Sequence, residues 1–174
     1  MSMIKGIRRV SVAVNRIDDA LSFYRDALGL SVSEDMELTD RGLRLVRVAL
    51  GGIDVELMEP TRADGPVGTF LQRRGEGLHH IAIEVEDIEL EMRTLLARGV
   101  ELIDREARTG PEGRIAFIHP RSTGGVLIEL YEANPSPTIR PPDPQPAAFE
   151  SNPHPNPAPQ GERDQVHPNA VPQE

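Results

Sequence analysis

The sequence predicts an α+β fold of two tandem βαβββ modules followed by a disordered Pro-rich C-terminal tail. Two repeats predict the modules. Residues 9–14 (RVSVAV) match residues 80–85 (HIAIEV) at an offset of 71, and residues 54–59 (DVELME) match residues 127–132 (LIELYE) at an offset of 73. A third observation separates the tail, because twelve of the 16 prolines lie between Pro135 and Pro172. That density favours disorder or a polyproline conformation over a packed core.

These boundaries predict one folded domain over residues 4–132. Module one is expected at 4–60, a linking segment with a helix at 61–75, and module two at 76–132, with the tail at 133–174. A chain of this length can bury a core of its own.

In module one, residues 9–14 alternate with the period of a half-buried strand. Asp18 and Asp19 then open a helical pattern that runs to Leu28, with Gly29 as its C-cap. Strands are expected at 30–36, 43–50 and 53–59, and the Gly51-Gly52 pair predicts a hairpin turn between the last two.

The linking helix is expected at 67–74, and module two repeats the order of module one. Residues 80–85 alternate as a strand, Asp87 opens a helical pattern, and Gly99 ends it. Strands are expected at 114–118 and 126–131, and the sequence GPEG at 110–113 predicts a loop.

Composition excludes several classes of protein. The chain has no cysteine, which excludes disulfides, zinc–thiolate sites and a cysteine nucleophile. No apolar run reaches the roughly 18 residues that span a bilayer, and no signal peptide is evident, so we expect a cytoplasmic protein with no membrane partner. A net charge of −9 without a basic stripe disfavours nucleic acid as a partner.

The repeat also pairs polar residues, namely Arg9 with His80 and Glu56 with Glu129. Alternation places Arg9 and His80 on the sheet face opposite the helices, so the four side chains converge if the two modules curl toward each other. One imidazole and two carboxylates suit a divalent ion such as Co²⁺, Mn²⁺, Fe²⁺, Ni²⁺ or Zn²⁺. The alternative is that Glu56 and Glu129 lie on a solvated face.

Two other histidines are weaker candidates. Alternation places His79 on the face opposite to His80, where it is expected to pack or cap. His119, before Pro120 at a strand end, fits either the edge of a pocket or a solvated turn.

Four stretches carry a resemblance to a known family: ALSFYRDALGL (20–30), VELMEP (55–60), RGEGLHHIAIEVEDI (74–88) and IAFIHPRSTGGVLIELYE (115–132). With their spacing they cover residues 4–132, and the tail has no counterpart. Paired βαβββ modules with these motifs resemble the vicinal oxygen chelate superfamily (glyoxalase/bleomycin resistance/dioxygenase fold). Within it, the sequence is most similar to the methylmalonyl-CoA epimerases.

This resemblance implies an isomerase that interconverts (R)- and (S)-2-methylmalonyl thioesters by metal-assisted removal and return of the α-proton. It implies Glu56, His80 and Glu129 as metal ligands, Glu129 as the catalytic base, and a divalent metal, with Co²⁺ ahead of Mn²⁺, Ni²⁺ or Zn²⁺. Where the family has a first histidine ligand, this chain has Arg9, which has no lone pair for a metal. Two expectations follow: Glu56, His80 and Glu129 hold a metal more weakly with more water in its shell, or Arg9 replaces the metal, pairs with Glu56 or Glu129 and holds a ligand carboxylate. Arg9 and His119 are candidates for substrate binding.

The resemblance also implies an acyl-CoA substrate, a homodimer and a place in propionate metabolism. Leu45 stands where some members have a second glutamate, which leaves Glu37 or Asp40 as guesses for the second base. By charge alone, the candidates for contacts with CoA are Arg62, Arg73, Arg74 and Arg121. Two alternatives remain: a metal-free module that binds a small anion through Arg9, or a glyoxalase I-like lyase.

Overall fold

The computed structural model describes residues 4–33 and 35–134. The predicted disordered tail lies outside the described residues, apart from its first two positions. Across the described ranges, no helix is long and apolar enough to cross a membrane.

The strands and helices follow the expected order. Module one consists of β1 (Ile4–Ala13), α1 (Ile17–Leu21) with the π-helix η1 (Ser22–Ala27), β2 (Met36–Leu38), β3 (Leu43–Leu50) and β4 (Ile53–Pro60). The linking helix is α2 (Pro66–Arg74). Module two consists of β5 (Gly77–Val85), α3 (Ile88–Ala97), β6 (Arg108–Thr109), β7 (Gly113–Ile118), the 3₁₀ turn η2 (Pro120–Ser122) and β8 (Ile128–Ala133).

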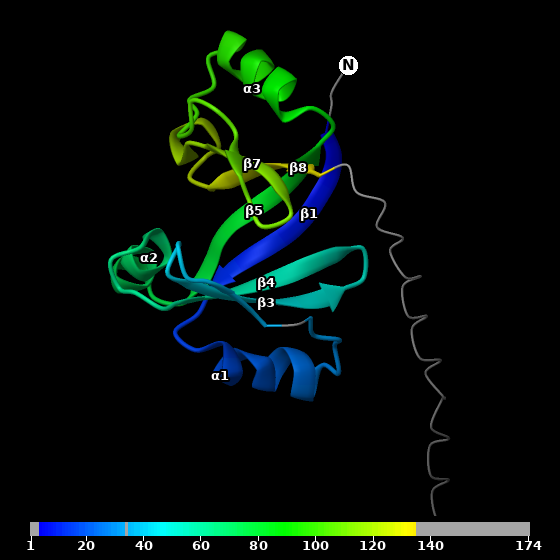
Figure 1. Ribbon diagram of the computed structural model, residues 1–174, viewed down its shortest axis with the longest axis vertical. Coiled ribbons are helices and arrows are strands. Elements are labelled where there is room, and N and C mark those ends of the chain that lie inside the picture. Colours follow the sequence, from blue (N-terminus) through cyan, green and yellow to red (C-terminus); the bar gives the residue numbers. More distant parts are fainter. Residues whose placement is uncertain (1–3, 34, 135–174) are drawn as a thin grey trace, which may run out of the picture. The chain divides into compact units, whose positions relative to one another are not determined.

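All eight strands form one mixed sheet in the order β2-β3-β4-β1-β5-β8-β7-β6. Each half has the same arrangement, with the first strand of the module parallel to its last strand, as β1 is to β4 and β5 to β8. The two halves join where β1 and β5 pair antiparallel. Figure 1 shows β1 and β5 running between α1 at one end and α3 at the other. The expected pair of βαβββ modules is therefore confirmed.

Each module has its own hydrophobic core beneath its helix, and the two cores are built from equivalent residues. Ile17 begins α1 and Ile88 begins α3, and both are fully buried. Leu57 in β4 and Leu130 in β8 lie in the corresponding positions beneath them. A third cluster, around Val67, packs α2 against the sheet. Helices α1 and α3 therefore cover one face of the sheet, whereas α2 packs on the opposite face, beside the site.

The two helices also begin in the same way. The backbone N–H of Ile17 donates to Oε2 of Glu59 at 2.7 Å, and that of Ile88 donates to Oε2 of Glu132 at 2.6 Å. In each module, the second-to-last residue of the final strand is a glutamate. Its carboxylate accepts a hydrogen bond from a backbone N–H at the start of that module's helix, which has no partner within the helix. In α3, Asp87 adds the expected N-cap by accepting from Leu90 N–H.

Two predicted elements differ in the structure. The helix expected to reach Leu28 is an α-helix only to Leu21. Beyond it the chain forms a π-helix, in which each hydrogen bond spans five residues, as from Leu28 N–H to Phe23 C=O at 3.0 Å. The strand predicted at 30–36 is reduced to a single bridge between Val32 and Val48, and β2 begins only at Met36. Oγ of Ser33 accepts from the backbone N–H of Arg47, and a side chain that takes a ladder position interrupts regular pairing there.

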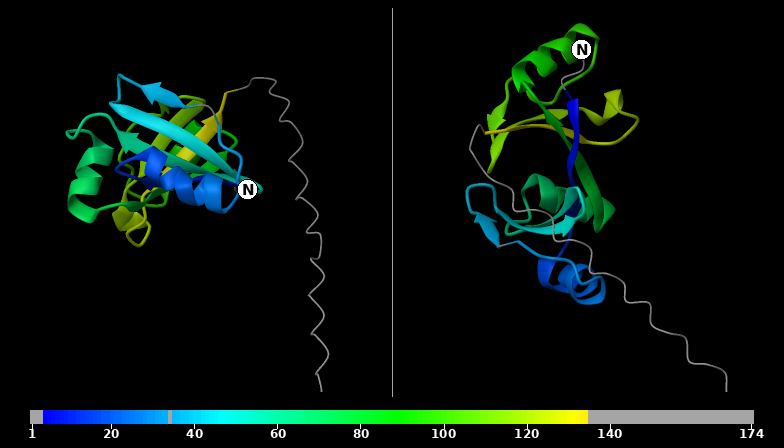
Figure 2. Two further views of the ribbon diagram at one scale, coloured as in Figure 1. Left: turned by 90° about the horizontal axis from the view of Figure 1, so that it is seen from below. Right: turned by 90° about the vertical axis from the view of Figure 1, so that its right-hand side faces the viewer.

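The sheet curls so that the outer strands of the two modules approach each other (Figure 2). Nη2 of Arg41, in the turn before β3, donates to the carbonyl oxygen of Thr109 in β6 at 2.5 Å. The face opposite α1 and α3 is therefore concave, and both modules contribute to it.

Candidate active site

Strand register brings four predicted residues together. Ser11 in β1 lies opposite Glu56 in β4 and His80 in β5, while Ala82 in β5 lies opposite Arg9 in β1 and Glu129 in β8. The two relations are equivalent under the repeat, so Glu56 and Glu129 flank the central strand pair symmetrically. Arg9, Glu56, His80 and Glu129 are each no more than 5% exposed. The alternative of acids on a solvated face is wrong for both glutamates.

The guanidinium of Arg9 lies between the two glutamates. Its Nη2 donates to Oε1 of Glu129 at 2.7 Å, and its Nε lies 3.7 Å from Oε1 of Glu56. The Arg9 guanidinium carbon lies 4.8 Å from the centroid of the Tyr131 ring, which provides a cation–π contact. Packing and charge together fix this side chain.

A second arginine and a third glutamate complete the cluster, and neither was predicted. Nε of Arg47 in β3 donates to Oε1 of Glu56 at 3.0 Å, and its Nη1 donates to Glu112. The other oxygen of Glu112 lies 3.6 Å from Nη1 of Arg9. Arg47 could have been noticed in the sequence, because it is a charged residue within the largely apolar strand pattern 43–50. Glu112 could not, because it lies in the 110–113 loop, where the sequence has no periodic pattern.

The two adjacent histidines share one hydrogen bond. Nδ1 of His80 lies 2.9 Å from Nδ1 of His79, so one donates and the other accepts. Nε2 of His80 lies 3.7 Å from Oε2 of Glu129 and has no hydrogen-bond partner. The expectation that His79 points to the opposite face is wrong. The β1–β5 register steps from Ser11–His80 directly to Val12–Leu78, and this irregularity breaks the alternation at His79.

Burial and neighbouring charges shift the ionisation of the cluster. Burial raises the pKa of Glu129, although Arg9 opposes the shift. Burial, with the nearby His79 and Arg9, lowers the pKa of His80 to about 3, so this imidazole is neutral at physiological pH. Burial also lowers the pKa of Arg9, but the carboxylates of Glu56 and Glu129 outweigh it and raise that pKa overall. The site therefore holds a fixed cation, a neutral imidazole and a carboxyl group that is more basic than usual.

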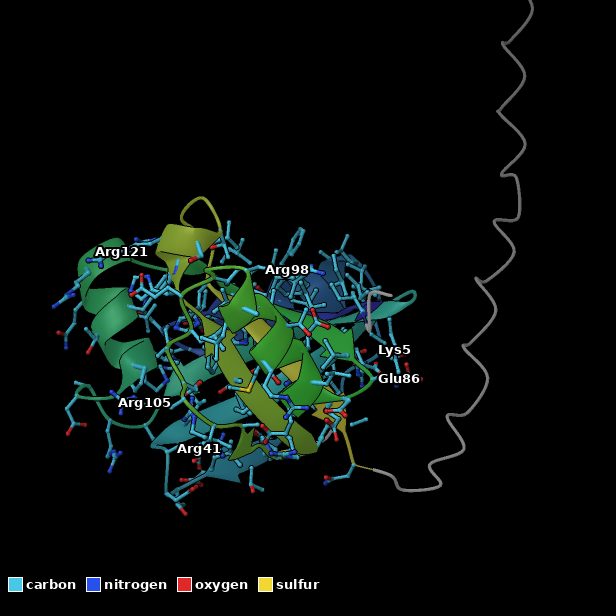
Figure 3. All side chains as sticks on the ribbon, turned by 90° about the horizontal axis from the view of Figure 1, so that it is seen from above. Lys5, Arg41, Glu86, Arg98, Arg105 and Arg121 are labelled. Carbon is cyan, nitrogen blue, oxygen red and sulfur yellow. The ribbon has the colours of Figure 1, made fainter. Side chains whose placement is uncertain are left out.

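These side chains face a cavity of about 350 Å³, a size typical of small-molecule sites. Leu45, Val67 and Phe117 contribute apolar wall, and the arginines that line it are Arg9, Arg41, Arg62 and Arg108. Arg73 and Arg74 line a second cavity of about 420 Å³, and His79 lines both. Figure 3 shows Arg41, Arg105 and Arg121 on one side of the described unit, with Lys5 and Glu86 on the other.

Three sequence candidates lie away from the main cavity. Glu37 and Asp40, the guesses for a second base, are not among its lining residues, although Leu45 is. His119 is also absent from that wall: its Nδ1 accepts from the backbone N–H of Arg121 at the start of η2.

The predicted metal ligands Glu56, His80 and Glu129 come from three strands to one place, but a cation already separates the two carboxylates. Among the described residues, no group of three or more histidine, aspartate or glutamate side chains is arranged to hold a metal ion. The donor set therefore does not fit a divalent ion in this arrangement.

Comparison with known proteins identifies the family of this fold. Residues 8–117 match the family model of the Glyoxalase/Bleomycin resistance protein/Dioxygenase superfamily. The chain belongs to this superfamily. Among its relatives in the superfamily, the mitochondrial methylmalonyl-CoA epimerase of Mus musculus is 40% identical over 129 residues, which cover 73% of this chain and 72% of that protein. The ethylmalonyl-CoA/methylmalonyl-CoA epimerase of Cereibacter sphaeroides is 31% identical over 75% of this chain and 99% of that protein.

Solved superfamily structures show the same likeness. The methylmalonyl-CoA epimerase of Mycobacterium tuberculosis superposes with a TM-score of 0.72 at 36% identity, covering 78% of this chain and 92% of that one. A methylmalonyl-CoA epimerase in complex with methylmalonyl-CoA and NH₄⁺ superposes with a TM-score of 0.70 at 32% identity, covering 76% of this chain and 96% of that one. Each of these likenesses covers about three quarters of this chain.

Proposed function

We propose that this protein is an isomerase that interconverts the (R)- and (S)-forms of a 2-methylmalonyl thioester of CoA. The observation that carries the proposal is Glu129, a buried carboxyl group of raised pKa beside a guanidinium on a cavity wall. Its support is that this chain is 40% identical to a protein named methylmalonyl-CoA epimerase.

The reaction requires a base and a positive group at fixed positions. Removing the proton α to a thioester carbonyl leaves an enolate whose negative charge lies on the thioester oxygen, and returning a proton to the opposite face inverts the carbon. Glu129 takes the proton on a carboxylate oxygen, and its raised pKa makes it a better base than an exposed glutamate. The N–H groups of Arg9 stabilise the oxygen. Only the C–H bond breaks and re-forms.

We assign His80 to positioning Glu129, because an imidazole 3.7 Å from that carboxylate lies on the same side of the substrate and does not serve the opposite face of the α-carbon. The sequence candidates supply no base for the opposite face. Leu45 cannot act as a base, and Glu37 and Asp40 do not line the cavity. Nε2 of His80 is buried without a partner, 3.7 Å from Oε2 of Glu129, so a small movement joins the two groups by a hydrogen bond. The hydrogen bond between Nδ1 of His79 and Nδ1 of His80 fixes the orientation of the His80 ring at its other nitrogen.

A basic surface supports CoA as the carrier of the acyl group. Arg41, Arg62 and Arg108 line the main cavity, and Arg73 and Arg74 line the neighbouring one. Guanidinium groups bind phosphate oxygens in bidentate geometry, and CoA carries several phosphates.

The divalent metal implied by the family resemblance, Co²⁺ first, enters no step of this mechanism. Such an ion would chelate the thioester oxygen and the substrate carboxylate. Here Arg9 lies between Glu56 and Glu129, the residues that would bind it. A homodimer, propionate metabolism and a cytoplasmic location remain predictions.

Proton exchange tests the proposal directly. The full-length protein is incubated in D₂O with one epimer of methylmalonyl-CoA, and the loss of the α-proton signal and the change in stereochemistry are followed by NMR and chiral chromatography. We expect exchange with inversion in the wild type and none in Glu129→Gln. Glu84→Gln is the matched control, since Glu84 is a half-buried glutamate that pairs with Lys5. No exchange in the wild type, or full exchange in Glu129→Gln, would refute the assignment.

The second candidate is a binding module that holds a small anionic ligand through Arg9 without turning it over. The observation in its favour is that Nε and Nη1 of Arg9 are buried donors without hydrogen-bond partners. Binding of methylmalonyl-CoA in the same samples, with no deuterium incorporation, would support this candidate over the epimerase. The glyoxalase I-like lyase has no comparable support among the relatives described above.

A further inference from the structure

Arg9 occupies the place that the repeat reserves for a ligand. The pseudo-two-fold relates Arg9 to His80 and Glu56 to Glu129, so three of the four equivalent positions carry groups with lone pairs. The fourth carries a guanidinium, which stays protonated and has only donors. Its Nη2 is hydrogen-bonded to Glu129 and its Nε is 3.7 Å from Glu56. The side chain thus fills the space between the two carboxylates instead of completing a ring of ligands.

The charges of the cluster balance closely without any further ion. The guanidinium groups of Arg9 and Arg47 face the carboxylates of Glu56, Glu112 and Glu129. Burial also favours the neutral form of Glu129, so the net charge is small. A divalent ion bound by Glu56, His80 and Glu129 would lie next to the Arg9 cation in a site shielded from water, where repulsion between like charges is strong.

Arg9 is held in this position by contacts on several sides. The side chain is 4% exposed, and it belongs to β1, which pairs with β4 on one side and β5 on the other. The Tyr131 ring is in cation–π contact with the guanidinium, and Glu112 and Arg47 close the cluster beyond it. The arginine is therefore part of the packed structure.

Two nitrogens of the guanidinium make no hydrogen bond, although Nε lies 3.7 Å from Glu56 and Nη1 lies 3.6 Å from Glu112. Nε and Nη1 are buried donors with no hydrogen-bond partner, and Arg9 lines the cavity. A buried unpartnered donor is costly unless an acceptor arrives, so an oxygen of a ligand is the natural partner. Each of these N–H groups offers such an oxygen a charge-assisted hydrogen bond.

We propose that Arg9 is the resident cation of this site, that it excludes a divalent metal, and that its free N–H groups bind an oxygen anion of the ligand. This deepens the function proposed above, because Arg9 then supplies the positive charge at the thioester oxygen or carboxylate. The exclusion of metal can be measured without any turnover, so its failure is distinct from a failure of the epimerase assignment.

The first test measures metal binding on the full-length protein after dialysis against EDTA. Co²⁺ is titrated into wild type, Arg9→His and Arg8→His, with calorimetry and the visible absorption of the bound ion as readouts. We expect no stoichiometric binding in the wild type and one Co²⁺ per chain in Arg9→His, in which four donor groups surround the site. Arg8→His is the matched control and should behave as wild type, since Arg8 pairs with Asp54 outside the cluster.

Wild-type protein that binds one Co²⁺ per chain would overturn the proposal, whether or not the variants fold. A folded Arg9→His protein that binds no more Co²⁺ than wild type would also overturn it, because another residue would then exclude the ion. Folding is checked by far-UV circular dichroism on each sample.

The second test measures the binding of malonyl-CoA, which carries both the thioester and a carboxylate, in the presence of EDTA. We expect wild type to bind it with unchanged affinity when Co²⁺ replaces EDTA, Arg9→Lys to retain part of the affinity, and Arg9→Met to lose it. Binding that depends on Co²⁺ in the wild type, or that survives intact in folded Arg9→Met, would refute the role of Arg9 as the cation.

Discussion

Replacing Arg9 by methionine removes the guanidinium between Glu56 and Glu129 and keeps an apolar side chain of similar length in its place. Both glutamates are about 95% buried, and Arg9 provides the only hydrogen bond that the side chain of Glu129 makes in the described part of the chain. Breaking a buried ion pair by removing one partner costs about 3–5 kcal/mol, because the other charge stays buried. We therefore expect Arg9→Met to lower the free energy of unfolding at pH 7 by about that amount.

The loss should depend on pH with a definite sign. Burial raises the pKa of Glu129, and Arg9 opposes that rise, so the variant has a still higher pKa at this position. A carboxyl group whose pKa is higher in the folded than in the unfolded protein contributes its full stabilisation below the unfolded-state pKa of about 4.3. That stabilisation is lost as the pH rises through the pKa that the group has in the folded protein. Loss of Arg9 also removes one cause of the lowered pKa of His80, which can then pair with Glu129. The deficit is therefore largest at neutral pH and shrinks toward pH 4.

Urea unfolding followed by circular dichroism measures the effect, since the chain has no tryptophan. The control is Arg8→Met on the same strand, where a more exposed pair with Asp54 at 2.7 Å should contribute only about 1 kcal/mol. The double variant Arg9→Met/Glu129→Gln should recover much of the loss, because it removes the stranded charge. An Arg9→Met deficit equal to that of Arg8→Met, or one that grows toward pH 4, would refute the reasoning.

Three further predictions concern other parts of the fold. Glu132→Ala should lower the free energy of unfolding by about 1–2 kcal/mol, because the amide at the start of α3 loses its acceptor; urea unfolding against Glu86→Ala checks it. Gly113→Ala should destabilise the protein, because the new Cβ would lie 2.1 Å from the carbonyl oxygen of Glu132. Gly52→Ala is the control, since its Cβ would meet nothing within 4 Å, and the thermal unfolding temperatures of the two variants test the prediction. The His80 imidazole should show no titration between pH 5 and 8 in NMR spectra, since its pKa is about 3, and a midpoint in that range would contradict the burial argument.

Much of the fold follows from short-range pattern. The alternation in β1 and β5, the acid-opened helices and the glycine turns all appear within short windows of sequence, and the offsets of 71 and 73 residues pair the strands that carry the site. The segment predicted as a strand at 30–36 forms only one bridge, between Val32 and Val48. The side chain of Ser33 accepts a hydrogen bond from Arg47, fourteen residues away, and no local pattern predicts that contact. The predicted orientation of His79 was wrong because the pairing of β5 with β1 shifts register at this residue. That shift depends on a strand far away in the sequence.

The sequence by itself determined the two modules and the four residues Arg9, Glu56, His80 and Glu129, because residue type and periodicity are local properties. Only the tertiary structure decided what these residues do together. Curling of the sheet brings Arg9 within 2.7 Å of Glu129, 120 positions away, and adds Arg47 and Glu112 to the cluster. Those contacts depend on how eight strands twist and close, and they decide that a guanidinium lies between the two carboxylates where a metal ion was expected.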